Sequence, residues 1–200
     1  MPDEQRDWSV FALLLIDVQH DFWKDGMSMP RETYESNVAR LLRVCRSENI
    51  DIVHLRASFK ADKSDWMLRY KYLDKIPCIE NTPGAEPFDC GAAQNSEPVL
   101  YKQSFDGFHN PELEQVLRAG GKEFLLVAGL VTSVCVLLTA ATAAQRGYLV
   151  AAVEDCCADQ PGAHEHTLQR YPFVFDRVGS NAIPDHFAAW REMLAAKAGQ

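Results

Sequence analysis

The sequence lacks two features that would point to large polyanionic or lipid partners. Its 28 acidic residues outnumber the 20 Lys and Arg, and a net charge of −8 argues against nucleic acid, whose phosphates need a basic surface. It also has no apolar run of the ~18 residues that a membrane span requires. We therefore expect no nucleic acid and no membrane among its partners.

Secretion signals and paired cysteine motifs are missing as well. The first ten residues, MPDEQRDWSV, lack the basic and then apolar segments of a signal peptide. We expect a cytoplasmic protein, in which the six cysteines are thiols rather than a disulfide framework. A disulfide between Cys78 and Cys90, which lie in a polar stretch, stays an alternative. None of the six cysteines forms a CxxC pair, so the sequence gives little support for a structural zinc site.

Repeats, low-complexity tracts and linkers are absent too, and 200 residues suffice for one domain, residues 1–200. Short apolar runs alternate with amphipathic stretches, which predicts a three-layer, Rossmann-like α/β fold with a six-stranded, mostly parallel sheet flanked by helices. The expected strands are Val10–Ile16, Ile50–Leu55, Pro98–Tyr101, Phe124–Ala128, Leu149–Val153 and Phe173–Phe175. The expected helices are Glu32–Glu48, Pro111–Arg118, Ser133–Arg146, Ala163–Arg170 and Asp185–Ala195.

Residues 57–97 break this alternation with polar stretches and prolines that have no clean period. An irregular insert of this length usually covers a site or an interface. It follows the second strand, and loops at the carboxyl ends of such strands form the ligand crevice of an α/β fold. We therefore expect the insert to lie near the active site.

Two charged residues directly follow buried strands. Asp17 comes after the apolar run Ala12–Ile16, and Lys102 comes after Val99–Tyr101. Each has an ordinary alternative, a turn or cap carboxylate for Asp17 and a solvated surface side chain for Lys102. Because the carboxyl ends of parallel strands share one edge of the sheet, the pair is more informative than either residue alone.

Cys135 is the most specific candidate. The strand Phe124–Ala128 leads into Gly129 and then into TSVC, where Thr132 or Ser133 can cap a helix with Cys135 in its first turn. There the backbone amides and the helix dipole favour a thiolate, so we predict a lowered thiol pKa and alkylation well below the pH at which an ordinary thiol reacts. The alternative is a small core residue, since free Cys is among the most buried residue types.

In this order, these residues resemble the isochorismatase-like cysteine hydrolases, which include nicotinamidases, N-carbamoylsarcosine amidases and ureide or biuret hydrolases. The most specific segments are LLLIDVQHDF, YKQSFDGF, AGLVTSVCVLLTAATAAQRGY and VEDCCAD. The resemblance implies a catalytic triad of Asp17, Lys102 and Cys135. It also implies a cis peptide at Leu130–Val131 and an oxyanion hole formed by the backbone amides of Val131 and Cys135.

The activity that the resemblance implies is hydrolysis of a C–N bond in a small amide, ureide or carbamoyl compound through a thioester on Cys135. Relatives commonly form dimers or tetramers, so we expect a homo-oligomer. Two alternatives stay open. A true isochorismatase cleaves a vinyl ether, and many of those enzymes replace the cysteine by a small residue. A ligand-binding scaffold without activity is the other.

The sequence also departs from its relatives. Nicotinamidases carry an Asp and two His in a D-x-H type pattern just after the second strand, where this chain reads VHLRASF. We therefore expect no metal and no other cofactor, and nicotinamide is not the expected substrate. His54 is expected to lie within the strand as a packed or partner-bonded histidine, and His109, His164 and His166 to lie in loops or on helix surfaces.

Substrate-binding residues are harder to predict. Arg56 is placed where it could meet a substrate carboxylate or carbonyl, with a surface ion pair as the alternative. The aromatic side chains expected to wall the pocket, for which ordinary core packing is the alternative, are Phe22, Trp23, Trp66 and Phe105.

Overall fold

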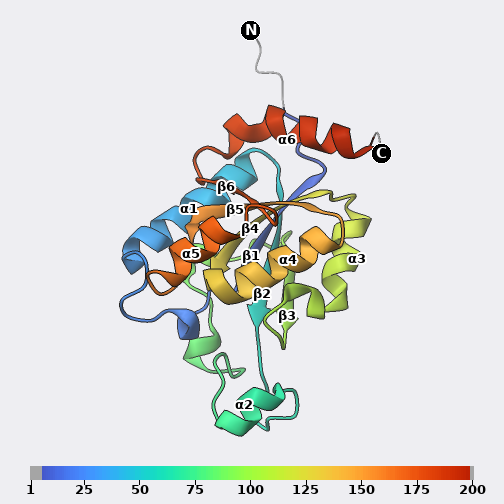
Figure 1. Ribbon diagram of the computed structural model, residues 1–200. Helices are drawn as coiled ribbons and strands as arrows, with labels where there is room; N and C mark the ends of the chain where they lie inside the picture. Colours follow the sequence, from blue (N-terminus) through green and yellow to red (C-terminus); the bar gives the residue numbers. More distant parts are fainter. Residues whose placement is uncertain (1–5, 199–200) are drawn as a thin grey trace.

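The computed structural model describes residues 6–198 and has a parallel β-sheet at its centre (Figure 1). The strands lie in the order β3-β2-β1-β4-β5-β6, and all neighbours are parallel. This confirms the predicted fold class. The strands are β1 (Phe11–Ile16), β2 (Asp51–Ala57), β3 (Val99–Lys102), β4 (Phe124–Leu130), β5 (Leu149–Ala158) and β6 (Asp176–Val178).

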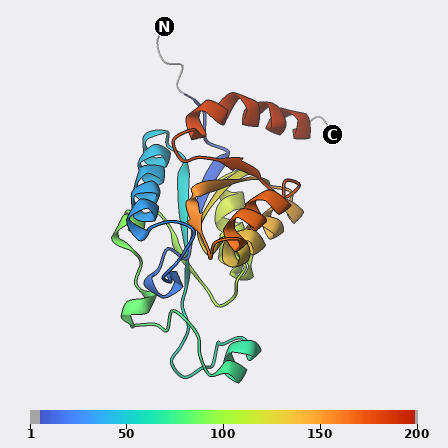
Figure 2. The same ribbon diagram turned by 60° about the vertical axis from the view of Figure 1, so that its left-hand side comes forward.

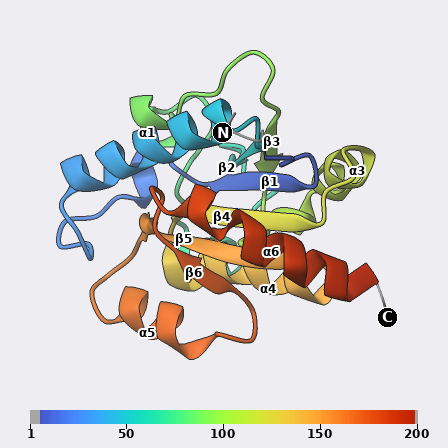
Figure 3. The ribbon, with the colours of Figure 1, turned by 90° about the horizontal axis from the view of Figure 1, so that it is seen from above.

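Helices cover both faces of the sheet (Figures 2 and 3). Buried side chains of α1 and α6 pack on one face, and those of α3, α4 and α5 pack on the other. None of the helices formed by residues 6–198 is long and apolar enough to cross a membrane. The helices are α1 (Arg31–Ser47), α2 (Leu68–Leu73), α3 (Pro111–Ala119), α4 (Leu137–Gln145), α5 (Ala163–Arg170) and α6 (Ile183–Ala198).

The continuous apolar runs of β1 and β4 follow from this layering. Every residue of both strands is buried, because successive side chains face opposite helical layers. Leu13 and Leu15 pack with α1, whereas Ala12 and Leu14 pack with α3 and α4. The core therefore lies on both sides of β1 and β4 and holds their carboxyl ends in fixed positions.

Gly129 allows β1 and β4 to approach closely at this edge. Its φ is +130°, a conformation that L side chains rarely adopt, and a Cβ atom there would lie 1.9 Å from the carbonyl oxygen of Ile16. Only glycine fits without moving the backbone. The end of β4 is thereby brought directly beside Asp17.

Two strand predictions need correction. The sixth strand is Asp176–Val178 rather than Phe173–Phe175, and Phe173 is exposed in a turn. The aromatic run was misleading because β6 lies at the edge of the sheet, where Asp176 and Arg177 remain exposed. The fifth strand continues to Ala158, beyond the predicted Val153, through charged residues that the apolar pattern excluded.

The segment 57–97 extends as an arm from the carboxyl end of β2 and carries α2, a helix that the sequence did not predict (Figure 1). The arm has a small core of its own, formed by Ala57, Phe59, Trp66, Ile76 and Cys78. All six cysteines are free, as expected, including Cys78 and Cys90.

Candidate active site

Asp17 follows the last residue of β1 in a left-handed conformation with a φ of +51°. Its amide donates to the carbonyl of Leu55, 2.8 Å away, and its Oδ1 accepts a hydrogen bond from the amide of Ala57 at 2.8 Å. The carboxylate is fully buried. It is thus fixed at the carboxyl edge of the sheet, with Oδ2 left to meet other groups.

Lys102 supplies the nearest positive charge. The parallel register pairs Lys102 with Ala57, the residue whose amide bonds Asp17, so the lysine is brought to the same point. Its Nζ lies 2.7 Å from Asp17 Oδ2 and donates to the carbonyl of Ser104 at 2.8 Å. The ion pair is almost completely removed from solvent.

Cys135 lies in the π-helical turn Thr132–Val136, which leads into α4. The peptide bond Leu130–Val131 before this turn is cis, as the resemblance implied. The Cys135 side chain is buried and within hydrogen-bonding reach of both Asp17 and Lys102. The three predicted catalytic side chains therefore meet at one place.

The electrostatics of this cluster differ from the sequence prediction. Burial raises the pKa of the Cys135 thiol well above its ordinary value, and the Asp17 carboxylate raises it further, while Lys102 opposes both. The predicted lowering of this pKa is therefore wrong. The helix dipole acts through partial charges and is outweighed by desolvation and a full negative charge.

The two charged partners respond to the same environment. Burial raises the pKa of Asp17, although Lys102 limits the shift. Burial alone would lower the pKa of Lys102, but the Asp17 carboxylate and the hydrogen bonds to Asp17 and Cys135 outweigh it and raise this pKa. The raised pKa of Cys135 favours the protonated thiol, and the Asp17 side chain, paired with Lys102, is a base within hydrogen-bonding reach of it.

A cavity of about 750 Å³ opens onto Cys135. It is lined by Val131, the residue before the turn Thr132–Val136, by Val134 within that turn, and by arm residues between Tyr70 and Pro77. The insert therefore lies over the candidate site, as its position after the second strand predicted. Of the aromatic side chains that the sequence singled out, Phe22 and Phe105 line this cavity.

The other three predicted substrate-binding residues lie elsewhere. Arg56 pairs in register with Tyr101, and both residues line a separate cavity. Successive side chains along β2 and β3 face opposite sides of the sheet, and the next pair, Ala57 and Lys102, lies toward Asp17. Trp66 is buried in the core of the arm, where its indole donates to the carbonyl of Lys60. Trp23 packs against Tyr34 and Phe88.

Two residues that the sequence did not single out, Asp159 and His164, bond the turn Thr132–Val136 that carries Cys135. Asp159, directly after β5, accepts hydrogen bonds from Ser133 through its amide at 2.8 Å and its hydroxyl at 2.6 Å. His164 Nδ1 lies 2.8 Å from the hydroxyl of Thr132, and its side chain is buried rather than on a helix surface. The acceptor for this turn is thus Asp159, not Thr132 or Ser133 as predicted.

The strand-end position that identified Asp17 could also have identified Asp159, since both acids directly follow a buried strand. Gln19 was missed as well. Its side chain bonds the amide and carbonyl of Ala57 at 2.9 Å each and the carbonyl of Ala85 at 2.7 Å. It thereby ties the arm to the strand end that carries Asp17.

The residues after β2 do not fit the metal site described for nicotinamidases. Among residues 6–198 there is no group of three His, Cys, Asp or Glu side chains that could hold a metal ion. His54 lies within β2, and its Nε2 is 2.8 Å from Glu97 Oε2. The buried His54 side chain and its contact with Glu97 agree with the expectation of a packed or partner-bonded histidine.

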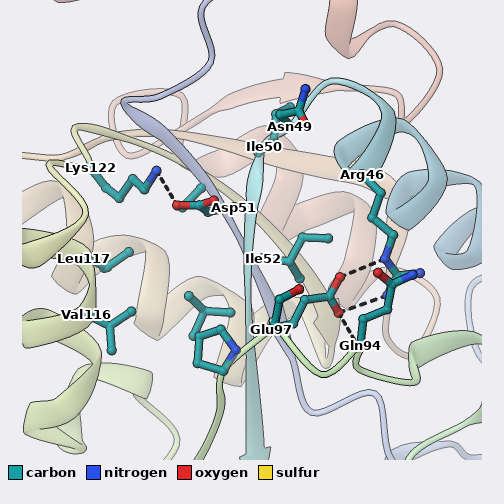
Figure 4. A pocket seen from close by; sticks show the side chains of 14 residues that line it. Arg46, Asn49, Ile50, Asp51, Ile52, Gln94, Glu97, Val116, Leu117 and Lys122 are labelled. Atoms are coloured by element: carbon teal, nitrogen blue, oxygen red, sulfur yellow. Dashed lines mark hydrogen bonds and ion pairs between the residues drawn. The ribbon is translucent and has the colours of Figure 1, made fainter.

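A second cavity, of about 390 Å³, lies near the start of β2, away from the catalytic edge (Figure 4). Its charged side chains bond one another. Arg46 Nε lies 2.8 Å from Glu97 Oε1, and Lys122 Nζ lies 2.6 Å from Asp51 Oδ2. Because these charges are neutralised internally, we do not assign this cavity a role in catalysis.

Comparisons with known proteins agree with this geometry. Residues 11–181 match the model of the isochorismatase domain family. The chain is 28% identical over 165 residues to a maleamate amidohydrolase of Pseudomonas putida, covering 78% of this chain and 76% of that protein. It is 28% identical over 149 residues to an uncharacterized isochorismatase family protein of Bacillus subtilis, covering 74% and 77%.

Solved structures show the same relationship. An isochorismatase family protein from Desulfovibrio vulgaris superposes with a TM-score of 0.80 at 30% identity, covering 90% of this chain and 98% of that one. A cysteine hydrolase from Pseudomonas syringae has a TM-score of 0.77 at 21% identity, covering 94% and 99%. The second likeness concerns the fold alone.

Proposed function

Because this chain belongs to the isochorismatase family of hydrolases, we propose that it cleaves a C–N bond of a small amide, ureide or carbamoyl compound through a thioester on Cys135. The observation that carries this proposal is the meeting of Cys135 with the buried Asp17–Lys102 pair at a cavity large enough for a small molecule. A maleamate amidohydrolase among the relatives is in keeping with it.

The first step transfers a proton and forms a C–S bond. Asp17 accepts the thiol proton as the sulfur of Cys135 attacks the substrate carbonyl carbon, so a free thiolate need not accumulate. The raised pKa values of the thiol and of Asp17 suit this coupled transfer, since the carboxylate is a stronger base than one in water. Lys102 compensates the negative charge of the pair.

The second step breaks the C–N bond. The tetrahedral oxyanion is stabilised by the backbone amides of Val131 and Cys135, which both lie along the cavity. As the intermediate collapses, Asp17 returns its proton to the departing nitrogen, and the acyl group remains on sulfur. An amide nitrogen is a poor leaving group without this protonation.

The third step releases the acid. Water attacks the thioester carbonyl carbon while Asp17 accepts a proton from the water. The oxyanion of the second tetrahedral intermediate is stabilised by the same two backbone amides. Its collapse breaks the C–S bond, and the proton on Asp17 returns to the sulfur of Cys135. The enzyme is regenerated, and the net reaction is hydrolysis.

A vinyl ether hydrolase is the rival within this family. That reaction needs proton delivery and water but no nucleophile, and a buried thiol beside the acid would serve no purpose in it. Cys135 lies against both Asp17 and Lys102 rather than in the hydrophobic layers alone. This contact favours the amidase reaction over both the vinyl ether reaction and an inactive scaffold.

The test combines product release with trapping. A panel of small amides, ureides and carbamoyl compounds is screened for release of ammonia or amine, and the protein is then mixed with the most active compound and quenched. We expect an acyl adduct in the intact mass, mapped to the peptide that holds Cys135. Turnover of vinyl ethers by both the wild type and Cys135→Ala, with no adduct, would overturn the proposal.

We further propose that residues 1–200 act as one domain, without a cofactor, in a homo-oligomer of two or four copies. Exposed apolar side chains on α2, among them Leu68 and Tyr72, are in keeping with contacts between copies. Sedimentation of the purified protein tests this state. The cytoplasmic location expected from the sequence stays a prediction.

A further inference from the structure

The cavity above Cys135 is largely apolar, but four charged residues also line it. The apolar walls include Phe22, Met27, Leu73, Ile76 and Phe105. The charged residues are Asp21, Lys24, Lys75 and Asp159. Their formal charges cancel, so the charge that a substrate meets depends on which of them already have partners.

Asp21 is bonded to the arm rather than to the cavity. Its Oδ2 accepts a hydrogen bond from the amide of Cys78 at 2.7 Å. Its other oxygen lies against Gly84 so closely that a Cβ atom there would be 2.1 Å from Oδ1. The carboxylate is thus enclosed by two segments of the arm and serves to hold them.

Asp159 is bonded in the same way. Its Oδ2 accepts from the amide and the hydroxyl of Ser133, and its Oδ1 accepts from the amide of Gln160 at 2.7 Å. Three donors therefore occupy this carboxylate. Because these donors compensate its charge locally, a substrate in the cavity meets little free acceptor capacity there.

The two lysines differ from the acids in this respect. Within the part of the chain that the structure describes, neither Lys24 nor Lys75 forms an ion pair or donates a side-chain hydrogen bond. Both ammonium groups are exposed and come from different segments, the loop before α1 and the arm after α2. They leave positive charge open at the mouth of a cavity in a chain of net charge −8.

We propose that Lys24 and Lys75 select amides that carry a second, anionic group, for which a carboxylate is the fitting chemistry. The inference rests on the proposed function, since it names the substrate class of the same site. The amide end reaches Cys135, the apolar part of the acyl chain lies along Phe22 and Phe105, and the carboxylate meets the ammonium groups at the mouth. A cavity of about 750 Å³ has room for this arrangement.

The first experiment compares matched amides of equal length that end in a carboxylate or in a neutral carboxamide. We expect kcat/KM of the wild type to favour the carboxylate, and the preference to fall as salt screens the lysines. In Lys24→Met/Lys75→Met the ratio of the two kcat/KM values should fall about tenfold. Lys71→Met, which removes an exposed lysine of α2 outside the cavity, is the matched control and should keep the wild-type ratio.

A second measurement does not require turnover. Two haloacetamide reagents of equal length, one ending in a carboxylate and one in a carboxamide, are reacted with the thiol, and the modified Cys135 peptide is quantified. We expect the ratio of their rates to fall about tenfold in Lys24→Met/Lys75→Met but not in Lys71→Met, and Lys24→Arg/Lys75→Arg to restore it. Lys102 is present in every variant, so its charge cancels in this comparison.

The outcomes separate the two proposals. If no amide is hydrolysed and no acyl adduct forms on Cys135, the proposed function fails. The ratio of the two haloacetamide rates then still decides whether the lysines attract anions. If amides are hydrolysed through Cys135 but the ratio is the same in the wild type and the double methionine variant, the role of the lysines is overturned. A preference for phosphate-bearing over carboxylate-bearing amides would overturn the choice of a carboxylate.

Discussion

At the scale of single residues, the buried charge of Asp17 has two opposite effects on Cys135. The carboxylate raises the pKa of the thiol, so it opposes formation of a free thiolate. It is also the base that takes the thiol proton during attack. Asp17 therefore disfavours a free thiolate in the resting protein but, in the proposed reaction, accepts the proton that allows the sulfur to attack.

This opposition gives a prediction for Asp17→Asn. Removal of the negative charge should lower the pKa of Cys135, so the midpoint of its alkylation rate should move to lower pH than in the wild type. Amide turnover should nevertheless fall at least a hundredfold, because no base remains. Alkylation rates followed by mass spectrometry from pH 6 to about 11, beside initial rates, check both parts. A midpoint that moves upward would contradict the assigned electrostatics.

Cys135→Ala provides the complementary prediction. Turnover of amides should fall below about a hundredth of the wild-type rate, since the nucleophile is lost. The fold should persist, because removing one buried sulfur costs only about 1 kcal/mol. Initial rates beside a thermal melt make the comparison, with Cys45→Ala as the control because Cys45 is a buried thiol of α1 far from the cavity lining. Residual activity above the stated fraction would exclude covalent catalysis by this thiol.

The positions of Asp17, Lys102 and Cys135 were predictable because each rests on a local pattern. An apolar run followed by Asp17, another followed by Lys102, and a glycine turn followed by Cys135 all describe strand ends. Parallel strands then bring these ends to one edge without further information. The pKa of Cys135 was not predictable, because it depends on burial and on Asp17, which is distant from it in the sequence.

At the scale of secondary-structure elements, the turn Thr132–Val136 depends on β5 and α5. Asp159 bonds Ser133, and His164 bonds Thr132, on either side of the entry to the turn. Asp159 lines the cavity with Cys135, but its carboxylate oxygens are bonded to Ser133 and Gln160, and His164 is bonded to Thr132. Both are positioning residues, which act through the orientation of the turn that carries Cys135.

We predict that Asp159→Asn lowers kcat of amide turnover about tenfold with a smaller change in KM. The asparagine retains one acceptor oxygen but loses the charge that bonds the amide and hydroxyl of Ser133. Initial rates over a range of substrate concentrations give kcat and KM separately. Asp25→Asn, in the exposed loop before α1, is the control for the loss of a carboxylate charge elsewhere. A rise in KM of about tenfold with an unchanged kcat would instead place Asp159 in substrate binding.

Glu97 links three elements before β3. It accepts hydrogen bonds from Arg46 of α1, from His54 of β2 and from the amide of Gln94. Burial alone would raise its pKa, but these donors lower it from 4.5 to about 2. Because Glu97 lies five residues before Lys102, this network ties α1 and β2 to the segment that leads into β3.

The lowered pKa of Glu97 predicts the pH dependence of stability. A group whose pKa is depressed on folding stabilises the protein above its unfolded value and loses that contribution as pH falls toward its folded value. Glu97→Gln should therefore destabilise the protein by about 2 kcal/mol at pH 7, with the difference shrinking between pH 4.5 and about 2. Urea unfolding at several pH values, with Glu192→Gln on the exposed side of α6 as control, measures it. A difference that is independent of pH would contradict the assignment.

At the scale of the whole molecule, the layers were easier to predict than the arm. Apolar periodicity predicts which runs are strands and helices, and the handedness and parallel pairing of such a fold leave few arrangements. The path of residues 57–97 has no comparable rule. Trp66 became the centre of a separate core, while Tyr70 and Leu73 reached the active-site cavity, and no local pattern distinguishes these aromatic and apolar residues.

The same limit explains Arg56. Arg56 was expected at the carboxyl end of the second strand and is the last residue but one of β2, but one residue decides which face of a strand a side chain takes. Ala57, not Arg56, pairs with Lys102 and bonds Asp17. The positive charges at the cavity come instead from Lys24 and Lys75, which lie in loops whose paths only the folded chain reveals.

The last prediction concerns the whole molecule's need for metal. The last two residues of β2 and the residue after it are Arg56, Ala57 and Ser58, and His54 within β2 is bonded to Glu97, so this region offers no ligand set of the D-x-H type. The proposed reaction takes its base from Asp17 and its oxyanion stabilisation from backbone amides, which need no Lewis acid. We therefore expect amide turnover to be unchanged within about twofold after exhaustive dialysis against a strong chelator. Initial rates before and after dialysis, with metal content measured on the same samples, check this. Loss of activity that one divalent ion restores would show that a metal takes part in the reaction.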